Sequence, residues 1–195
     1  IDNLVGDLSV TNMTIDGTPV EANTDGSFTY APPADFDGEV TLEYNVTDGN
    51  LTSPQSTTSI IDIVSVNDDP TATDTTATTG EDSNLTGGVD IDVLTDNASD
   101  VDGGTLSVAS VGTATNGTVT INADGTVNYT PNEGAFDSLA EGATATDTFT
   151  YTVSDGQGGT TTASTTVTIT GSNDGPVATD TTATTGEDSN LTGGV

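Results

Sequence analysis

The chain contains an internal repeat. The segment ATDTTATTGEDSNLTGGV occupies residues 72–89 and occurs again, unchanged, at residues 178–195. The motif VNDDP at residues 66–70 has a similar counterpart, SNDGP, at residues 172–176. The two copies start 106 residues apart. Repetition at this period predicts a series of similar domains, and a unit of about a hundred residues can bury one modest core.

A diverged copy of the repeat lies upstream in the same order. GDLSV (6–10) matches GTLSV (104–108), DGSFTYAP (25–32) matches DGTVNYTP (124–131), and LEYNVTDG (42–49) matches FTYTVSDG (149–156). We therefore expect an N-terminally incomplete repeat at 1–68, a complete repeat at 69–173 and the opening strand of a third repeat at 174–195. On this interpretation the chain is an excerpt from a longer tandem array.

Short segments in which apolar and polar residues alternate recur along the chain. They are rich in Val, Ile and Thr, and they include residues 106–108, 119–121, 127–129, 149–153 and 167–169. Alternation with period two is typical of half-buried strands, and the Asp-Gly and Gly-Gly pairs between them favour tight turns. No segment has helical periodicity. The pattern predicts an all-β fold of tandem antiparallel Greek-key β-sandwiches, of immunoglobulin type, in a linear array.

Two tyrosines occupy matching positions late in the two repeats. Tyr44 and Tyr151 each stand two residues before an apolar position, Val46 and Val153. This is the spacing of a tyrosine corner, and it is equally that of a Tyr in an ordinary amphipathic strand. Under either interpretation the two side chains are structural.

No side chain of the protein carries a positive charge. There are 31 acidic residues and no Lys, Arg or His, so the net charge is −31, while only 31% of residues are apolar. Such a chain is close to the limit at which folding fails, and multivalent cations are a natural source of the missing counter-charge. The composition excludes nucleic acid and anionic membranes as partners, because nothing can neutralise a phosphate. The absence of cysteine excludes disulfides and thiolate metal sites, and no apolar run is long enough for membrane insertion.

The carboxylates gather in turns and at the repeat junctions. Turns of a sandwich meet at its two ends, so acidic residues that are distant in sequence can converge there. Ca²⁺ takes six to eight oxygen ligands from carboxylates, Asn side chains and backbone carbonyls, and it needs neither His nor Cys. The candidate Ca²⁺ ligands are Asn67, Asp68, Asp69, Glu81, Asp82, Asp100, Asp102, Asp147, Asp155, Asn173 and Asp174.

Turn formation is the competing explanation for these residues, because Asp and Asn favour turns without any metal. We expect Asp25 and Asp124, in NTDGS and NADGT, to be hairpin residues. Glu81 and Asp82 are equally consistent with a ligand pair and with a polar turn. For Asp100 and Asp102 the unbalanced charge favours a ligand role.

These motifs, in this order, resemble the cadherin-like tandem repeats of giant bacterial adhesins, which include RTX-type proteins exported by type I secretion. The motifs are VNDDP and SNDGP, the early Glu81, DVDG at residues 100–103 and YTVSDGQGG at residues 151–159, and the resemblance covers essentially the whole chain. It implies Ca²⁺ at each junction. By position, the first junction uses Asn67, Asp68, Asp69, Asp100 and Asp102, with Asp37 as a further candidate, and the second uses Glu81, Asp147, Asn173 and Asp174. The Asp-Arg-Glu loop of animal cadherins is absent, so Asp147 is assigned by position only.

The resemblance implies a structural role for the repeats. They would be extender repeats of a secreted or surface-anchored bacterial adhesin, stiffened by Ca²⁺ between neighbouring repeats of the same polypeptide and supporting cell adhesion or biofilm formation. We do not expect an enzyme, because without His, Cys, Lys and Arg only carboxylate chemistry remains.

Two alternatives stay open. The Thr-rich segment at residues 159–170 could present a regular face to a glycan, to ice or to a protein, although a sugar site would be expected to expose aromatic side chains. Alternatively, residues 177–195 of one molecule could complete the first repeat of another, giving head-to-tail self-association into a filament by strand exchange.

Overall fold

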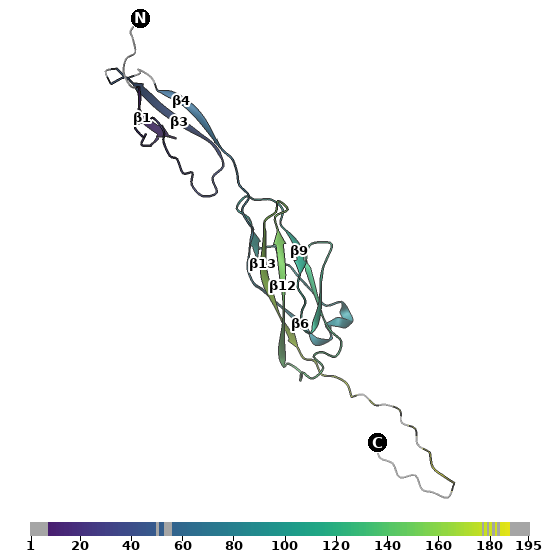
Figure 1. The fold of residues 1–195 in the computed structure, drawn as a ribbon. Coiled ribbons are helices and arrows are strands. Elements are labelled where there is room, and N and C mark those ends of the chain that lie inside the picture. The colour runs from purple at the N-terminus through teal and green to yellow at the C-terminus, as the bar shows by residue number, and fades with distance from the viewer. Residues whose placement is uncertain are drawn as a thin grey trace. The chain divides into compact units, whose positions relative to one another are not determined.

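The computed structural model describes residues 8–49, 51–52, 56–176, 178, 180, 182 and 184–187 (Figure 1). The chain divides into two compact units. The first comprises Ile1–Thr71, Ala98–Ser107 and Val153–Thr161, and the second comprises Ala72–Asn97, Val108–Thr152 and Thr162–Val195. The regular secondary structure of the described residues is almost entirely β-strand, as the alternating pattern predicts. No helix among them is long and apolar enough to cross a membrane.

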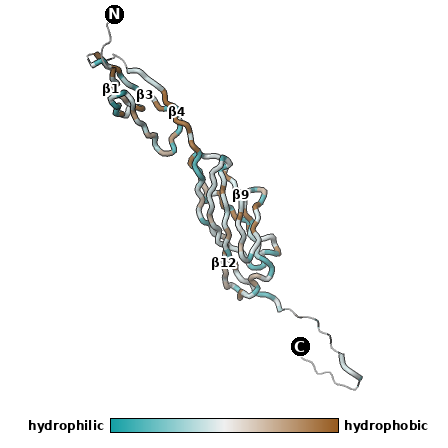
Figure 2. The backbone as a smooth tube through the Cα atoms, in the orientation of Figure 1, coloured by the Kyte–Doolittle hydropathy of each residue, from teal (hydrophilic) through white to brown (hydrophobic). Residues whose placement is uncertain are grey.

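A four-stranded antiparallel sheet forms most of the first unit. Its strands are β1 (Ser9–Ile15), β2 (Thr18–Pro19), β3 (Gly38–Thr47) and β4 (Thr57–Ile63), in the order β2-β1-β3-β4. Met13, Ile15, Val40 and Leu42 alternate with polar residues along β1 and β3, and they form a buried cluster. Figure 2 shows the hydrophobic segments on β3 and β4. The core of this sheet therefore lies on one of its two faces.

The second unit is built on two sheets. The larger has the order β6-β13-β12-β9, and the smaller has the order β10-β11-β7. The strand bounds are β6 (Thr75–Gly80), β7 (Val89–Ile91), β9 (Ser107–Val111), β10 (Gly117–Ile121), β11 (Val127–Pro131), β12 (Thr144–Ser154) and β13 (Thr160–Thr170). Two short strands, β5 (Thr71–Ala72) and β8 (Ala98–Ser99), form a separate pair.

The hydrophobic core of the second unit lies between these two sheets. Alternate residues of the long strands β12 and β13 are fully buried, among them Tyr151, Val167 and Ile169. The smaller sheet contributes Val127 and Tyr129, neither of which is exposed. The arrangement is a β-sandwich, as expected from the sequence, and its turns gather at its two ends.

Three details differ from or refine the expectation. β6 pairs with β13 in parallel, Thr75 opposite Thr165 and Gly80 opposite Thr170, so the sandwich is not purely antiparallel. A short 3₁₀ helix, η1 (Glu81–Thr86), follows β6, although no helical periodicity marks it. The Tyr151 hydroxyl donates to the carbonyl of Thr73 at 2.6 Å, far upstream in sequence, whereas a tyrosine corner bonds only a few residues upstream. Tyr151 is nevertheless structural.

Candidate metal sites

The parallel pairing of β6 and β13 brings one acidic cluster together. Both strands run in the same direction and end side by side, so the residues that follow them emerge at the same end of the sandwich. Glu81 and Asp82 follow β6, and Asp174 follows β13. One carboxylate oxygen from each of the three lies within 4.8 Å of the others. We call these residues the Glu81 cluster.

Glu81 is the buried member of this cluster, with an exposed fraction of 6%. Its Oε1 accepts hydrogen bonds from the Ser172 N–H at 2.6 Å and from the Ser172 hydroxyl at 3.1 Å. The Ser172 hydroxyl also lies 2.5 Å from Asp82 Oδ2. Oε2 of Glu81 is buried and has no hydrogen-bond partner among the described residues. A buried carboxylate oxygen is stable only when a donor or a cation compensates it, so Oε2 fits a metal ligand.

The electrostatics of Asp174 point the same way. Desolvation raises the pKa of its carboxyl group, and the neighbouring Glu81, Asp137 and Asp82 carboxylates raise it further. No positive side chain exists in the protein to oppose this repulsion. Carboxylate oxygens from three residues, one of them buried, match the preference of Ca²⁺ for hard anionic ligands.

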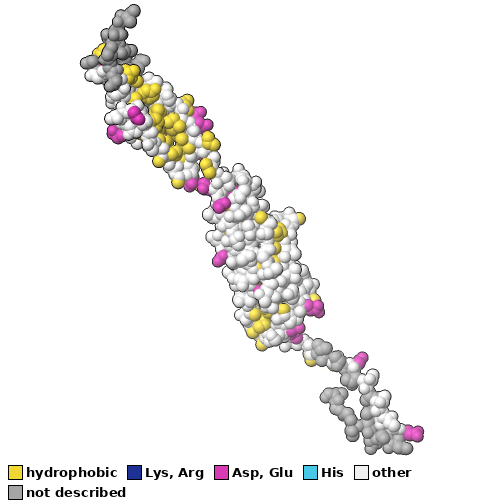
Figure 3. Space-filling model, in the orientation of Figure 1, with side chains coloured by type: hydrophobic (Ala, Val, Ile, Leu, Met, Phe, Trp, Pro, Cys, Tyr) yellow, Lys and Arg dark blue, Asp and Glu magenta, His cyan; other side chains and the backbone are white. Residues whose placement is uncertain are grey.

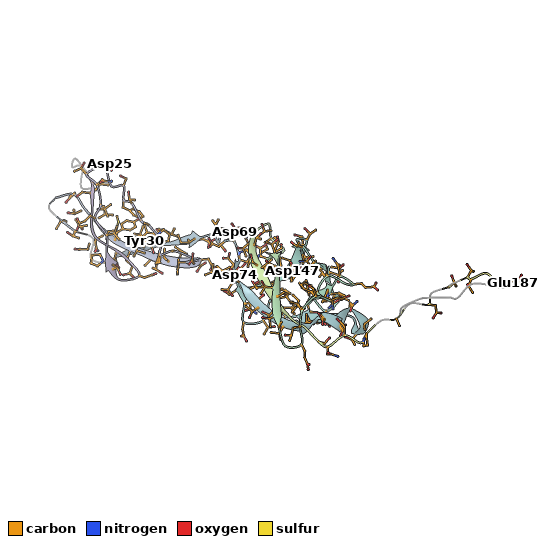
Figure 4. The ribbon with its side chains drawn as sticks, turned by 90° about the horizontal axis from the view of Figure 1, so that it is seen from below. Asp25, Tyr30, Asp69, Asp74, Asp147 and Glu187 are labelled. Atoms are coloured by element: carbon orange, nitrogen blue, oxygen red, sulfur yellow. The ribbon has the colours of Figure 1, made fainter. Side chains whose placement is uncertain are left out.

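A second acidic cluster lies in the first unit. Its members come from the segment before β5, the turn after β8 and the turn between β12 and β13, and they are Asn67, Asp68, Asp69, Asp100, Asp102 and Asp155. The Asp68 N–H donates to Asp102 Oδ2 at 2.7 Å, and the Asp102 N–H donates to Asp100 Oδ1 at 2.9 Å. We call these six residues the Asn67 cluster; Figure 4 labels Asp69.

Two members of the Asn67 cluster have the properties expected of cation ligands. Asp100 Oδ2 is buried and has no hydrogen-bond partner in the described part of the chain. Partial desolvation raises the pKa of the exposed Asp68 carboxyl group, and the carboxylates of Asp35, Asp102, Asp100 and Asp69, in that order, raise it further. Both observations describe negative charge that the protein itself does not neutralise.

Asp155 is already well supplied with donors. Its Oδ1 accepts from the backbone amides of Gln157, Gly158 and Gly159, and its Oδ2 accepts from the side chain of Asn67 at 2.7 Å. The Asn67 bond, followed by the backbone bonds, lowers the pKa of Asp155. A Cβ at Gly159 would collide with Asp155 Oδ2 and closely approach Asp69 Oδ1, so glycine is needed where these acids meet. Asp155 therefore orders the turn that holds Asn67 in place.

Asp147 does not belong to the Glu81 cluster, which corrects the assignment by position. It is buried in the sandwich (Figure 4), where Oδ1 accepts from the Thr115 and Thr148 amides. Oδ2 accepts from the Asn116 amide at 2.8 Å and from the Tyr129 hydroxyl at 3.0 Å. Four donors satisfy this carboxylate, so we assign it a structural role and remove it from the candidate ligands.

The remaining predicted residues are placed as follows. Asn173 donates from its side chain to the carbonyl of Asp174 at 3.5 Å, as Asn67 does to Asp68 at 3.2 Å. The two junction motifs thus share this local hydrogen bond. Asp25 and Asp124 accept hydrogen bonds from Ser27 and Thr126 in their turns, as expected of hairpin residues. Ser172, which positions Glu81, was not among the predicted residues, although it directly precedes the Asn173-Asp174 pair in the sequence.

Comparison with known families identifies the fold. Residues 67–171, just over half of the chain, match the bacterial cadherin-like domain, and residues 2–62 match a cadherin-like domain. The chain belongs to the bacterial cadherin-like domain family. Cadherin-like domains are extracellular repeats that typically serve adhesion, typically lack catalytic activity and generally bind Ca²⁺. No curated protein sequence matches the chain.

One solved structure supports the fold. Human protocadherin-24 EC1-2 is 14% identical with a TM-score of 0.55, and the match covers 89% of this chain and 85% of that one. Human mucin-like protocadherin EC1-2 is also 14% identical, with a TM-score of 0.48 and coverage of 83% and 86%. Mouse clustered PcdhgC3 EC1-3 is 17% identical, with a TM-score of 0.46 and coverage of 85% and 55%. At these identities the protocadherin-24 match supports the cadherin fold alone.

Proposed function

We propose that these cadherin-like repeats bind Ca²⁺ at the Glu81 and Asn67 clusters and serve as stiffened spacers in a secreted or surface-attached bacterial adhesin. The buried Oε2 of Glu81, beside two further carboxylates, carries this proposal. Asp100 Oδ2 supports it independently in the Asn67 cluster. A large RTX-type adhesin exported by type I secretion, active in adhesion or biofilm formation, is the context that the sequence motifs favour.

The repeat boundaries belong to the same proposal. We infer one repeat at 1–68, a second at 69–173 and the beginning of a third at 174–195, and the family matches at 2–62 and 67–171 fall close to these limits. Each acidic cluster then lies where one repeat gives way to the next. A bound divalent ion would hold the Asn-Asp segment in one conformation, whereas mutual repulsion would loosen it without the ion.

Direct titration tests the metal sites. We expect calorimetric binding of Ca²⁺ in the range of roughly 10⁻⁴ to 10⁻³ M that is typical of extracellular modules. Glu81→Gln should weaken one class of site tenfold or more, because the ligand oxygen and its charge are removed. Glu43→Gln removes the same charge from an exposed position on β3 and should leave binding unchanged. Equal affinities for the two variants would contradict the assignment of Glu81.

The spacer role needs a separate measurement. The small-angle scattering profile of the whole chain should differ between millimolar Ca²⁺ and excess chelator, because bound Ca²⁺ would order the segments that join the repeats. Identical profiles in both solutions would contradict stiffening even if Ca²⁺ binds. The two experiments therefore separate binding from its mechanical consequence.

A further inference from the structure

The smaller sheet of the second unit has an open edge at β10. In the order β10-β11-β7, β10 pairs with β11 alone among the described strands. Its pairing with β11 is regular from Gly117, opposite Pro131, to Ile121, opposite Val127. Every residue of the matched bacterial cadherin-like domain, 67–171, is described, and β10 lies in the interior of that range. The open edge is therefore a feature of the domain itself.

Two neighbouring backbone hydrogen bonds show which groups of β10 face this edge. The Asn116 carbonyl accepts and the Asn122 amide donates, each at 2.9 Å, in bonds to residues that directly flank β11. Both residues therefore face β11. Because successive residues of a strand point their backbone groups to opposite sides, Thr118 and Thr120 also face β11. The residues whose N–H and C=O groups point to the open edge are Gly117, Val119 and Ile121.

This edge lacks the features that usually keep strand edges from pairing, which are charged side chains, proline and bulges. The sequence of β10, GTVTI, has no charge and no proline, and its pairing with β11 contains no bulge. Residues 103–123 contain no acidic residue at all. Elsewhere, as Figure 3 shows, acidic side chains have no Lys, Arg or His beside them. Two copies of a polyanion repel each other least along such a neutral edge.

β10 is also suited to antiparallel pairing with itself. In a pair centred on Val119, Gly117 of each copy lies opposite Ile121 of the other, and Thr118 lies opposite Thr120. All the outward N–H and C=O groups then have partners, because the three outward residues pair among themselves. Ile121 is 41% exposed, and its cross-strand neighbour Gly117 has no side chain to collide with it, so pairing would cover apolar surface. We propose that two copies of this domain associate edge to edge through β10, in the register centred on Val119.

The partner is a second copy because the edge is neutral and complementary to itself. A pair of five-residue strands is small beside a stable protein interface, so isolated copies should associate weakly. If the domains form a tandem array, as the proposed function holds, many such edges would act together and strengthen the contact. The pairing itself uses backbone groups and requires neither the array nor Ca²⁺. It also differs from the strand exchange of residues 177–195, most of which lie outside the described residues.

Cross-linking tests the proposed register, because the chain has no cysteine of its own. Thr118 and Thr120 are exposed, and in the proposed pair their Cα atoms would lie about 4.5 Å apart, within reach of a disulfide. The Thr118 residues of the two copies would be diagonal neighbours at about 7–8 Å, which is too far. A mixture of the Thr118→Cys and Thr120→Cys variants, one of them carrying a size tag, should therefore form mixed disulfides several-fold in excess of either same-variant product on mild oxidation.

Thr76→Cys and Thr78→Cys supply the matched control. These two exposed threonines are also two residues apart on an edge strand, β6. Their mixture should give mixed and same-variant disulfides only in the proportion set by random collision. The same random proportion for the β10 mixture would overturn the register, and cross-linking of the β10 variants no greater than that of the β6 variants would overturn the contact.

Sedimentation of the unmodified chain tests the association itself. Its mean mass should rise over a hundredfold increase in concentration, in moderate NaCl so that the two polyanions are screened. Thr118→Asp/Thr120→Asp should abolish the rise, because like charges would lie directly opposite each other across the pair. Thr76→Asp/Thr78→Asp adds the same charge on β6 and should associate like the unmodified chain. A monomer at every concentration, or unchanged association of the β10 variant, would overturn the proposal.

Discussion

Buried carboxylates in this protein are of two kinds. Asp147 and Asp155 each accept at least four hydrogen bonds, chiefly from backbone amides. Glu81 and Asp100 each keep one buried oxygen without a partner among the described residues. Because the chain has no cationic side chain, backbone donors and external cations are the main groups that can compensate a buried carboxylate. Donor supply therefore separates structural carboxylates from candidate ligands.

The hairpin residue Asp124 allows a test of such compensation without any metal. The Thr126 hydroxyl, followed by the Thr126 amide, lowers the pKa of the Asp124 carboxyl group below its ordinary value of 3.8. Thr126→Val removes the hydroxyl donor, so the pKa should rise toward that value. The stability from this bond is present above the unfolded-state pKa and is lost as the pH falls through the lower folded-state pKa. Carboxyl-carbon NMR titration checks this, with Asp25 as the internal control; an unchanged Asp124 titration would contradict it.

Sequence reasoning located the acidic clusters but could not sort their members. The motifs around Asn67 and Glu81 were visible because Asp and Asn concentrate there. Asp147 looked like a ligand, and only the fold shows that amides from Thr115 and Asn116, some thirty residues earlier, saturate it. A sequence does not show which backbone amides will donate to a carboxylate. It also does not show which buried carboxylate oxygen will lack a donor.

At the scale of elements, alternation was a reliable guide to the strands of the large sandwich. β10, β11, β12 and β13 each contain a predicted segment, because apolar residues there alternate between core and surface. β6 was not predicted, since its sequence TTATTG carries almost no apolar signal. It is held instead by parallel pairing with β13 and by one buried hydroxyl pair, Thr75 with Thr165.

This hydroxyl pair makes β6 testable. Thr165 has no exposed surface and Thr75 has an exposed fraction of only 9%. Removing one hydroxyl therefore leaves the other buried without its hydrogen-bond partner. Thr165→Val should destabilise the protein by about 1–3 kcal/mol, whereas Thr75→Val/Thr165→Val should recover most of that loss because no unpaired hydroxyl remains. Denaturant unfolding of the single and double variants measures the coupling. If the stability losses of the two single variants simply add in the double variant, the two hydroxyls do not interact.

At the scale of the whole molecule, the charge of −31 acts in two separable ways. General repulsion among the carboxylates falls with ionic strength, whatever the ion. Binding at the Glu81 and Asn67 clusters follows mass action instead, and it requires an ion that accepts many oxygen ligands. The first effect belongs to the composition and the second to the fold, since only the fold brings the cluster members together.

Thermal unfolding separates the two effects. At equal ionic strength we expect CaCl₂ to raise the Tm more than NaCl does. A site exposed to a free Ca²⁺ concentration of ten times its Kd stabilises the folded state by about 1.4 kcal/mol. MgCl₂ should act less strongly than CaCl₂, since Mg²⁺ demands octahedral geometry and gives up water reluctantly. Glu81→Gln should lose part of the Ca²⁺ response and keep the NaCl response. If the CaCl₂ and NaCl curves coincide, the clusters are ordinary acidic turns and the repeats are stabilised by screening alone.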